Sequence, residues 1–207
     1  MPDFSEPYIV LLGGGSASGK STLLTHLQAD LSPHLTALSM DHYYRPRHTL
    51  RVDDAGFINY DHPDALDLDR MHHDLGRLQR GASIQVAPYT FETGSHAPPE
   101  QIPSRPLLVV EGLFCFVHSW LWEMAHLRVF LHIDPNRAFQ RRRQRDVEQR
   151  GIPIETVEYQ WNAHVRPAYA QYLEPYREAV DLVIPVPAGW ERGYCVLRDH
   201  LHMRVAR

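Results

Sequence analysis

Short apolar runs recur along the chain and alternate with stretches of helical periodicity. The first run, YIVLL at residues 8–12, precedes a glycine cluster and then an amphipathic stretch from Ser21 to Leu31. That order is typical of a strand, a loop and a helix. Further apolar runs lie at residues 35–40, 107–110, 127–133 and 180–184. The alternation predicts an α/β fold, a doubly wound parallel sheet with helices on both faces.

Two segments between these strands carry signals of their own. Apolar residues at positions 68, 71, 75 and 78 predict a helix between Asp64 and Gly81. The segment 83–106 holds five prolines, which favour a hairpin-like insertion over a core strand. With 207 residues, of which 43% are hydrophobic, we expect a single domain over residues 1–207 that includes this insertion.

The glycine cluster after the first strand carries a phosphate-binding pattern. Residues 14–21 read GGSASGKS and satisfy G-x-x-x-x-G-K-S. Glycines permit the positive φ values that turn backbone N–H groups toward phosphate oxygens, and the following helix presents its positive end to the same anion. Lys20 is expected to bridge the β- and γ-phosphates, and the Ser21 hydroxyl to bind Mg²⁺. The predicted ATP-binding residues in this loop are Gly14, Gly15, Ser16, Ala17, Ser18, Gly19, Lys20, Ser21 and Thr22.

Lys20 is the only lysine of the chain, and all the other residues of the Lys and Arg class are arginines. A compact ammonium differs physically from a planar guanidinium, which suggests a specific need at position 20. The single lysine also argues against a GTPase, although residues 53–56 match the D-x-x-G pattern of that class. The guanine-reading element N-K-x-D would require a second lysine.

Two carboxylates follow predicted strands beside the phosphate loop. Asp41 comes after the second apolar run, at the edge of the sheet where open α/β folds bind ligands. It is a candidate general base for an attacking hydroxyl, and the alternative is an aspartate that caps a loop. Glu111 follows the run at residues 107–110 and is a candidate magnesium group, directly or through water. Its alternative is an exposed glutamate at a strand end.

Six arginines lie between Asn136 and Arg150 on a predicted helix. Arg137, Arg141 and Arg145 follow each other at i, i+4 spacing and therefore share one face. The segment is either a solvated surface or a lid over residues 136–152. In the second case its guanidinium groups would close over a transferring phosphoryl group, stabilise its charge and exclude water.

Composition restricts the class of partner and the compartment. The net charge of -4 and the isoelectric point near 6.4 argue against nucleic acid and acidic membranes, so we expect a small-molecule partner. The two cysteines are too few for a disulfide scaffold, and the acidic start MPDFSEP is unlike a signal peptide. The most apolar window is shorter than a membrane-spanning helix requires. These features predict a cytoplasmic protein.

Seven motifs, in order, resemble those of the uridine-cytidine kinase family, within its superfamily with phosphoribulokinase. They are GGGSASGKST, SMDHYY, NYDHPDALD, PYTFETGSH, VVEGLF, RRRQRDVEQRG and VRPAYAQYLEPYREAVDLVIP. The resemblance covers residues 8–185. It implies a kinase that uses ATP and Mg²⁺ to phosphorylate the 5′-hydroxyl of uridine or cytidine. It also implies a homo-oligomer, with a tetramer as the expected form.

The resemblance also implies roles for individual residues. Asp41 would be the general base, with Lys20 and Arg145 as the other catalytic residues, and Arg145 and Arg150 would reach the triphosphate. Asp61 and Arg142 would bind the ribose 2′- and 3′-hydroxyls. The substrate-binding residues implied in this way are Asp41, Tyr44, Asp61, Tyr89, Phe91, Arg142 and Gln160.

Two positions depart from the family pattern. Gly94 stands where the family places a histidine against the pyrimidine, and Ile152 stands where it has an arginine. We therefore expect loose base discrimination, with less than about tenfold between uridine and cytidine. An acceptor that is another sugar-like alcohol, such as a phosphoribulokinase-type substrate, remains an alternative. A nucleotide-binding regulator without catalysis is a second one, although it would not need Asp41. The choice between ATP and GTP as donor stays open.

Overall fold

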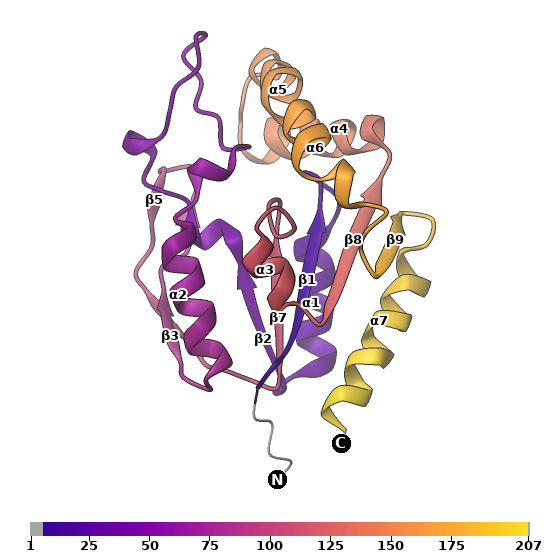
Figure 1. Cartoon of the computed structure of the whole chain (residues 1–207). Coiled ribbons are helices and arrows are strands. Elements are labelled where there is room, and N and C mark those ends of the chain that lie inside the picture. The colour runs from indigo at the N-terminus through magenta and orange to yellow at the C-terminus, as the bar shows by residue number, and fades with distance from the viewer. Residues whose placement is uncertain (1–5, 207) are drawn as a thin grey trace.

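A five-stranded parallel sheet forms the centre of the computed structural model, which describes residues 6–206 (Figure 1). The strand order is β2-β7-β1-β8-β9. The strands are β1 (Tyr8–Gly14), β2 (Leu35–Ser39), β7 (Leu107–Gly112), β8 (Leu127–Ile133) and β9 (Leu182–Val186). The predicted doubly wound parallel sheet is thus confirmed, and each predicted apolar run contributes a strand.

Two strand ends differ from the predicted ones for local reasons. Met40 lies outside β2, because it opens a 3₁₀ turn, Met40–Tyr43, in which the Ser39 hydroxyl accepts from the Asp41 amide. The last strand begins two residues later than predicted, since the Val180 amide still donates to the Tyr176 carbonyl in the preceding turn. This strand lies at the edge of the sheet, where Pro185 is tolerated.

Helices cover both faces of the sheet. They are α1 (Lys20–Leu31), α2 (Leu68–Gln79), α3 (Ser119–Met124), α4 (Pro135–Gln144), α5 (Ile154–Gln160), α6 (Arg166–Tyr172) and α7 (Trp190–Val205). Leucines of α1 and α7 share one buried cluster with β1, and apolar residues of α2 and α3 share the other. Helices α4, α5 and α6 gather beyond the carboxyl ends of the strands, at the top of Figure 1. They therefore face the edge where the phosphate loop begins.

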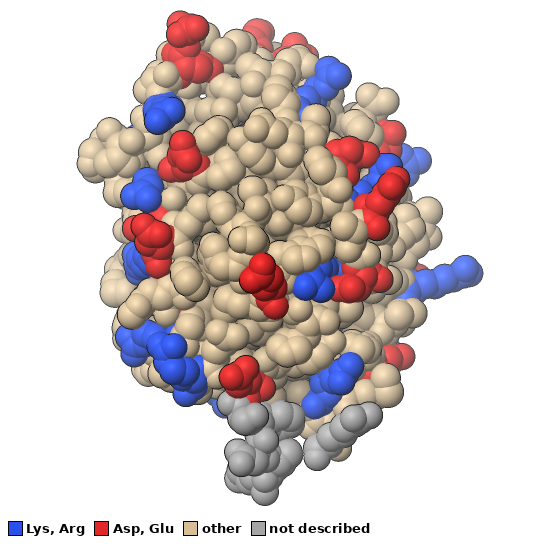
Figure 2. Space-filling model, in the orientation of Figure 1, with Lys and Arg blue, Asp and Glu red and all other residues tan. Residues whose placement is uncertain are grey.

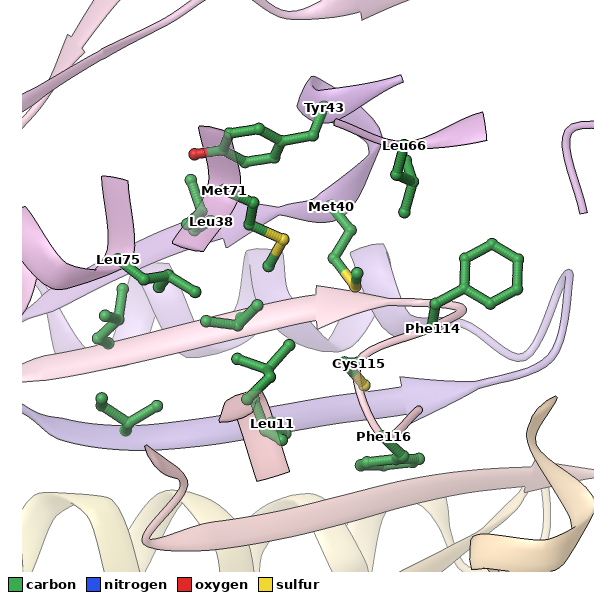
Figure 3. Packing of buried hydrophobic residues seen from close by; sticks show 14 of the residues in the cluster. Leu11, Leu38, Met40, Tyr43, Leu66, Met71, Leu75, Phe114, Cys115 and Phe116 are labelled. Carbon is green, nitrogen blue, oxygen red and sulfur yellow. The ribbon is translucent and has the colours of Figure 1, made fainter. Parts of the chain in front are cut away.

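Alternation along β1 explains why the sheet needs both layers. Ile9 and Leu11 belong to the cluster under α2 and α3, whereas Val10 and Leu12 belong to the cluster under α1 and α7. Successive side chains of a strand point to opposite faces, so an all-apolar strand requires cover on both. Figure 3 shows the first cluster, in which side chains from several segments surround Leu11.

Close packing also explains a glycine at the end of β7. A Cβ atom at Gly112 would lie 2.6 Å from Cγ of Met40, which is closer than real contacts allow. Glycine therefore lets the start of the 3₁₀ turn pack directly against the strand. Asp41 follows Met40 in this turn, and Glu111 precedes Gly112, so the tight contact keeps the two candidate carboxylates near each other.

The segment after α2 forms two short antiparallel pairs, as the predicted hairpin requires. Strand β3 (Ile84–Val86) pairs with β6 (Glu100–Ile102), and β4 (Tyr89–Thr90) pairs with β5 (Ser95–His96) between them. The predicted helix before it is α2, which begins at Leu68 rather than Asp64. Its cap is Asp67, whose carboxylate accepts from the Arg70 amide.

The surface carries charges of both signs. On the face seen in Figure 2, acidic and basic side chains are interspersed among neutral residues. Across residues 6–206, every helix is too short or too polar to qualify as a membrane span.

Candidate active site

One large cavity lies between the phosphate loop, the carboxyl ends of β2 and β7, and the helices α4 and α5. Its volume is about 1060 Å³. Ligand pockets commonly occupy about 300 to 1,000 Å³, so this one has room for two small molecules side by side. Most of the predicted site residues line it: Ser16, Ala17, Ser18, Gly19, Lys20, Ser21, Thr22, Asp41, Tyr44, Asp61, Phe91, Glu111, Arg142, Arg145, Arg150 and Gln160.

The phosphate loop forms one wall of the cavity. Gly19, at the start of α1, has a φ of 96°, and Ala17 adopts a φ of 59°, which is unusual for a residue with a side chain. A left-handed alanine next to a helix start indicates backbone held in shape for a ligand. The Lys20 ammonium donates to the carbonyl oxygens of Gly14 and Gly15 at 3.0 and 3.2 Å. These two glycines thus contact Lys20, although they do not line the cavity themselves.

Ser39 organises the two carboxylates opposite the loop. Its hydroxyl donates to Oε1 of Glu111 at 2.6 Å and accepts from the Asp41 amide at 3.2 Å. The pairing is a consequence of sheet register, since Ser39 lies opposite Glu111 across β2 and β7. Ser39 was not predicted as a site residue. Its place at the end of β2, two residues before Asp41, was the feature that could have indicated it.

Burial raises the pKa of two carboxyl groups that line the cavity, Asp41 and Asp61. It is the largest of the effects that raise the pKa of Asp41 to about 6, and the neighbouring charge of Glu111 adds to it while Lys20 counteracts. Burial also raises the pKa of Asp61, and Arg142 is the strongest of the cations that oppose this shift. A carboxyl group with a pKa near neutrality is suited to accept a proton from a hydroxyl.

The oxygen donors around Lys20 suit a magnesium ion. Ser21 lies at the first turn of α1 and lines the cavity, and the carboxylate of Glu111, which is only 6% exposed, lines it as well. Mg²⁺ is bound through one or two protein oxygens together with water and substrate phosphates, and these residues provide that kind of donor set. Groups of three or more His, Cys, Asp or Glu side chains arranged to hold a metal do not occur within residues 6–206.

Asp146 gathers the arginines of the predicted lid. The carboxylate is 1% exposed, and its Oδ1 accepts from Arg145 at 2.8 Å and from Arg150 at 3.1 Å. Its Oδ2 forms an ion pair with Nε of Arg142 at 3.2 Å. Arg142 also donates from Nη1 to the Ser16 hydroxyl of the phosphate loop at 3.2 Å. One carboxylate thus holds three guanidinium groups at the cavity wall, and the cluster keeps a net positive charge.

The backbone changes its helical period where these arginines meet. A π-helical segment, Arg145–Gln149, follows α4 directly. Single π-helical turns inside helices are frequent at functional sites, because they redirect side chains from the regular stripe. Of the three arginines predicted to share a face, Arg141 and Arg145 line the cavity, and Arg137, near the start of α4, does not. Asp146 was not predicted from the sequence, although it is the one carboxylate among residues 135–147.

Aromatic side chains form the wall around the acceptor carboxylates. The rings of Tyr44 and Phe91 lie 5.2 Å apart, and the Tyr44 hydroxyl donates to the Tyr60 carbonyl at 3.0 Å. Tyr89 lies behind them: it does not line the cavity, its ring centroid is 5.2 Å from that of Phe91, and its hydroxyl is 3.3 Å from that of Tyr60. Among the implied substrate residues, Tyr89 therefore supports the wall and does not face the cavity.

A second group of residues ties a loop to the helical segments that follow the lid. Oδ2 of Asp53 accepts from the Tyr159 hydroxyl at 2.9 Å and lies 2.8 Å from Nε2 of His164. Oδ1 of the same residue accepts from the amides of Ala55 and Phe57, which shapes the turn. This Asp53 latch connects residues 53–57 to α5 and the π-helical segment Trp161–Val165, and its member His164 lines the cavity. This role of Asp53 was not predicted from the sequence, where the residue appeared only as part of the D-x-x-G pattern.

Gly94 and Ile152 have different surroundings. Ile152 lines the cavity and supplies an apolar surface, as its side chain requires. Gly94 has a φ of 68°, and a Cβ atom there would lie 2.6 Å from Cβ of Arg47. A histidine at position 94, the family pattern, therefore does not fit while Arg47 keeps its place. Arg47 itself lines the cavity and was missed, because nothing in the segment RPRHT indicates a ligand contact.

At the other end of the cavity, beyond the phosphate loop, the wall is aromatic. Trp190 lines it together with His26, Val186 and Pro187. The indole stacks on the Tyr194 ring with a centroid distance of 5.4 Å and an interplanar angle of 6°. A flat apolar surface at this end suits the base of a nucleotide whose phosphates lie in the loop.

Comparisons with known proteins agree with this geometry. The sequence pattern of the "Phosphoribulokinase / Uridine kinase family" matches residues 9–189. A protein of Chloroflexus aggregans named uridine kinase is 34% identical over 185 residues, which cover 87% of each chain. A mouse protein named uridine-cytidine kinase-like 1 is 33% identical over 204 residues. That match covers 97% of the present chain and 37% of the mouse protein.

Solved structures show the same fold at low identity. A protein of Silicibacter described as a putative fructose transport system kinase has a TM-score of 0.72 at 18% identity, with 89% of this chain and 93% of that one covered. Phosphoribulokinase from Rhodobacter spheroides has a TM-score of 0.64 at 16% identity, with 88% of this chain and 71% of that one covered. Kinases with different acceptors thus share this arrangement of sheet and helices.

Proposed function

This chain belongs to the Phosphoribulokinase / Uridine kinase family of kinases, and we propose that it transfers the γ-phosphoryl group of ATP to the 5′-hydroxyl of uridine or cytidine. The supporting observation is that Asp41, a buried carboxylate with a pKa raised to about 6, shares one cavity with the phosphate loop. A regulator that only binds nucleotide has no use for such a base. The names of several relatives at 31 to 34% identity point to the same acceptor.

Each wall of the cavity has a part in this reaction. The loop and Lys20 would hold the triphosphate, and Mg²⁺ bound by Ser21 and Glu111 would neutralise phosphate charge. Asp41 would take the proton of the attacking 5′-hydroxyl at a carboxylate oxygen. Arg145 and Arg150 would contact the triphosphate once nucleotide competes with Asp146 for their N–H groups. The lid over residues 136–152 would exclude water that could otherwise accept the phosphoryl group.

Asp61, Arg142 and Gln160 would hold the nucleoside. Burial raises the pKa of Asp61, so its carboxylate gains from hydrogen bonds to the ribose hydroxyls. Aromatic residues such as Tyr44 and Phe91 would enclose the sugar and base. A deoxyribonucleoside would leave these buried polar groups without a partner, which can cost about 10⁴-fold in kcat/KM.

We also propose a homo-oligomer, with a tetramer as the expected form, and a location in the cytoplasm, as the resemblance of the sequence motifs implies. Size-exclusion chromatography with light scattering measures the first directly.

An assay of nucleoside diphosphate release, ADP from ATP and GDP from GTP, over a panel of acceptors tests the proposal. The panel contains uridine, cytidine, deoxyuridine, ribulose 5-phosphate and fructose, each with ATP and with GTP as donor. The Asp41→Asn variant, purified identically, shows how much activity comes from contaminating kinases. We expect turnover of the two ribonucleosides and little of deoxyuridine. Turnover of a sugar phosphate or fructose without the ribonucleosides would replace the nucleoside by a sugar acceptor, and nucleotide binding without any turnover would indicate the regulator.

A further inference from the structure

Arg47 combines a place on the cavity wall with hydrogen-bond donors that the protein leaves free. Its Nε donates to the Tyr60 hydroxyl and its Nη2 to the Phe91 carbonyl, both at 3.3 Å. A guanidinium carries five N–H groups, so three remain without an acceptor on residues 6–206. Both bonds made are long, and the side chain is exposed. The remaining N–H groups are therefore available to a ligand.

Arg47 depends on the absence of a side chain at position 94. The Arg47 amide donates to the Gly94 carbonyl at 3.1 Å, which joins the two segments. A Cβ atom at Gly94 would lie 2.6 Å from Cβ and 2.8 Å from Nε of Arg47. The φ of 68° at Gly94 is also a conformation that residues with side chains rarely adopt. The Arg47 side chain thus occupies the space that a side chain at position 94 would need.

The place of Arg47 follows from the layout of the cavity. If Asp41 takes the proton of the 5′-hydroxyl, the acceptor ribose lies close to Lys20, and its base extends away from the phosphate loop. The residues that line the cavity on that side include Ile58, Tyr60, Phe91 and Ile152. The aliphatic members of this group offer no hydrogen bond, and the Tyr60 hydroxyl already bonds Arg47 and Tyr89. Arg47 donates to the Phe91 carbonyl and is then a cation placed to contact a polar edge of the base, whereas Arg150, the other cation beside Phe91, donates to Asp146.

We infer that Arg47 is a specificity-determining residue that reads the acceptor base and favours a ring carbonyl over an exocyclic amine. This inference rests on the proposed nucleoside kinase activity. Uracil presents a carbonyl oxygen at the position where cytosine presents an amino group. A guanidinium only donates, so it can bond the carbonyl but leaves the amine facing another donor. The expected selection is therefore for uridine.

The magnitude follows from the cost of one lost hydrogen bond to a charged group. Such a bond is worth about tenfold to a hundredfold in binding or in kcat/KM. The sequence alone led to the opposite expectation, less than about tenfold between uridine and cytidine, because Gly94 and Ile152 lack donors. Arg47, which lies in a different segment, supplies the hydrogen-bond donors that Gly94 and Ile152 lack.

The test compares kcat/KM for uridine and cytidine in the wild type and three variants. Arg47→Leu removes all donors at similar bulk, and Arg47→Gln offers both a donor and an acceptor. Arg51→Gln is the matched control, because Arg51 lies in the same segment and does not line the cavity. We expect the wild type and the control to prefer uridine by about tenfold or more. Arg47→Leu should lower kcat/KM for uridine by a similar factor with little change for cytidine, and Arg47→Gln should bring the two substrates within a few-fold.

Two results would overturn the inference. One is a wild type that uses both ribonucleosides equally well. The other is an Arg47→Leu variant that loses uridine and cytidine activity in parallel, since that would assign Arg47 only to the support of Tyr60 and Phe91. The KM for ATP and the melting temperature of each variant report whether the fold is intact. A wild type that phosphorylates neither ribonucleoside but does phosphorylate a sugar contradicts the proposed function itself and removes the premise of the inference.

Discussion

The two halves of the cavity are built in different ways. The phosphate-binding part of the donor half is one continuous stretch, residues 14–22, which runs from the end of β1 into the first turn of α1, and its main internal contacts join Lys20 to carbonyls five and six positions earlier. The acceptor half comes from several separate segments, which contribute Asp41 and Arg47, Ile58 and Asp61, Phe91, Glu111, Arg142, and Ile152 to His164. Local backbone geometry shapes the first half, and tertiary packing shapes the second.

This difference predicts which of the two substrates a substitution affects. In the donor half, the loop is held by its own left-handed residues and by the helix start, so a change acts mainly on the nucleotide. Around the acceptor half, residues of one segment depend on contacts with another: Gly94 packs against Arg47, Glu111 accepts from Ser39, and Asp53 contacts His164. Changes there should spread between segments and alter the choice of acceptor. Four predictions test the contrast.

The largest effect is expected at Lys20. Lys20→Ala should reduce kcat by about 10³-fold or more, the range reported for a cation acting on a transferring phosphoryl group. Lys20→Arg should fail to restore activity, because a planar fork cannot take the place of a point charge that two loop carbonyls position. Steady-state kinetics with uridine as acceptor measures this, and circular dichroism controls for folding. Turnover like that of the wild type in the arginine variant would refute the proposed role.

Substitution of Asp41 should lower the catalytic rate and leave ATP binding unchanged. Asp41→Asn should lower kcat by about 10² to 10⁴-fold, the usual contribution of a positioned general base. ATP binding, measured by calorimetry, should change little, because the loop is formed without Asp41. Ser39→Ala is the informative companion: it keeps the base but removes its link to Glu111, so we expect a smaller loss. An unchanged kcat in Asp41→Asn would exclude Asp41 as the base.

The pH dependence of kcat/KM should also reflect the role of Asp41 as a base. Burial, with Glu111 next, raises the pKa of Asp41 to about 6, so the carboxyl is protonated and inactive as a base below that pH. We expect kcat/KM for the nucleoside to rise about tenfold per pH unit below pH about 6, and then to level off. In Asp41→Asn this limb should disappear. A wild-type profile that is flat between pH 5 and 7 would contradict the assignment.

The smallest effect is expected at the Asp53 latch. Desolvation raises the pKa of Asp53, but hydrogen bonds from the Phe57 amide, Tyr159 and His164 outweigh it and lower this pKa below the usual value. The latch thus stays charged until the pH falls through that lowered pKa. Asp53→Asn should raise the KM for the nucleoside several-fold, because the latch supports the acceptor wall through α5. The KM for ATP should not change, and Asp54→Asn on the same turn is the control. Equal changes in both KM values would show that the halves are not separate.

The same contrast decides what the sequence can predict. The donor loop could be predicted because G-x-x-x-x-G-K-S ties each role to a fixed spacing, and strand and helix patterns gave its surroundings. Asp41 and Glu111 were accessible for a related reason, since each follows an apolar strand and parallel strands end at one edge. Arg47 and Asp146 were not, because their roles depend on which distant residues pack against them. Tyr89 shows the reverse case: its motif is present, yet its side chain packs against Phe91 and does not line the cavity.

The hydrogen bonds of Lys20 to the loop carbonyls have a practical consequence for spectroscopy. Because no other lysine occurs in the chain, the ε-amine in the phosphate loop is chemically unique. Reductive methylation with ¹³C-formaldehyde would place one side-chain label there, in addition to the label on the chain's α-amino group. The resonance of that methylated amine would report, from one side chain, the exchange of carbonyl partners for phosphate oxygens. The labelled Lys20 side chain would therefore report nucleotide binding at the phosphate loop directly.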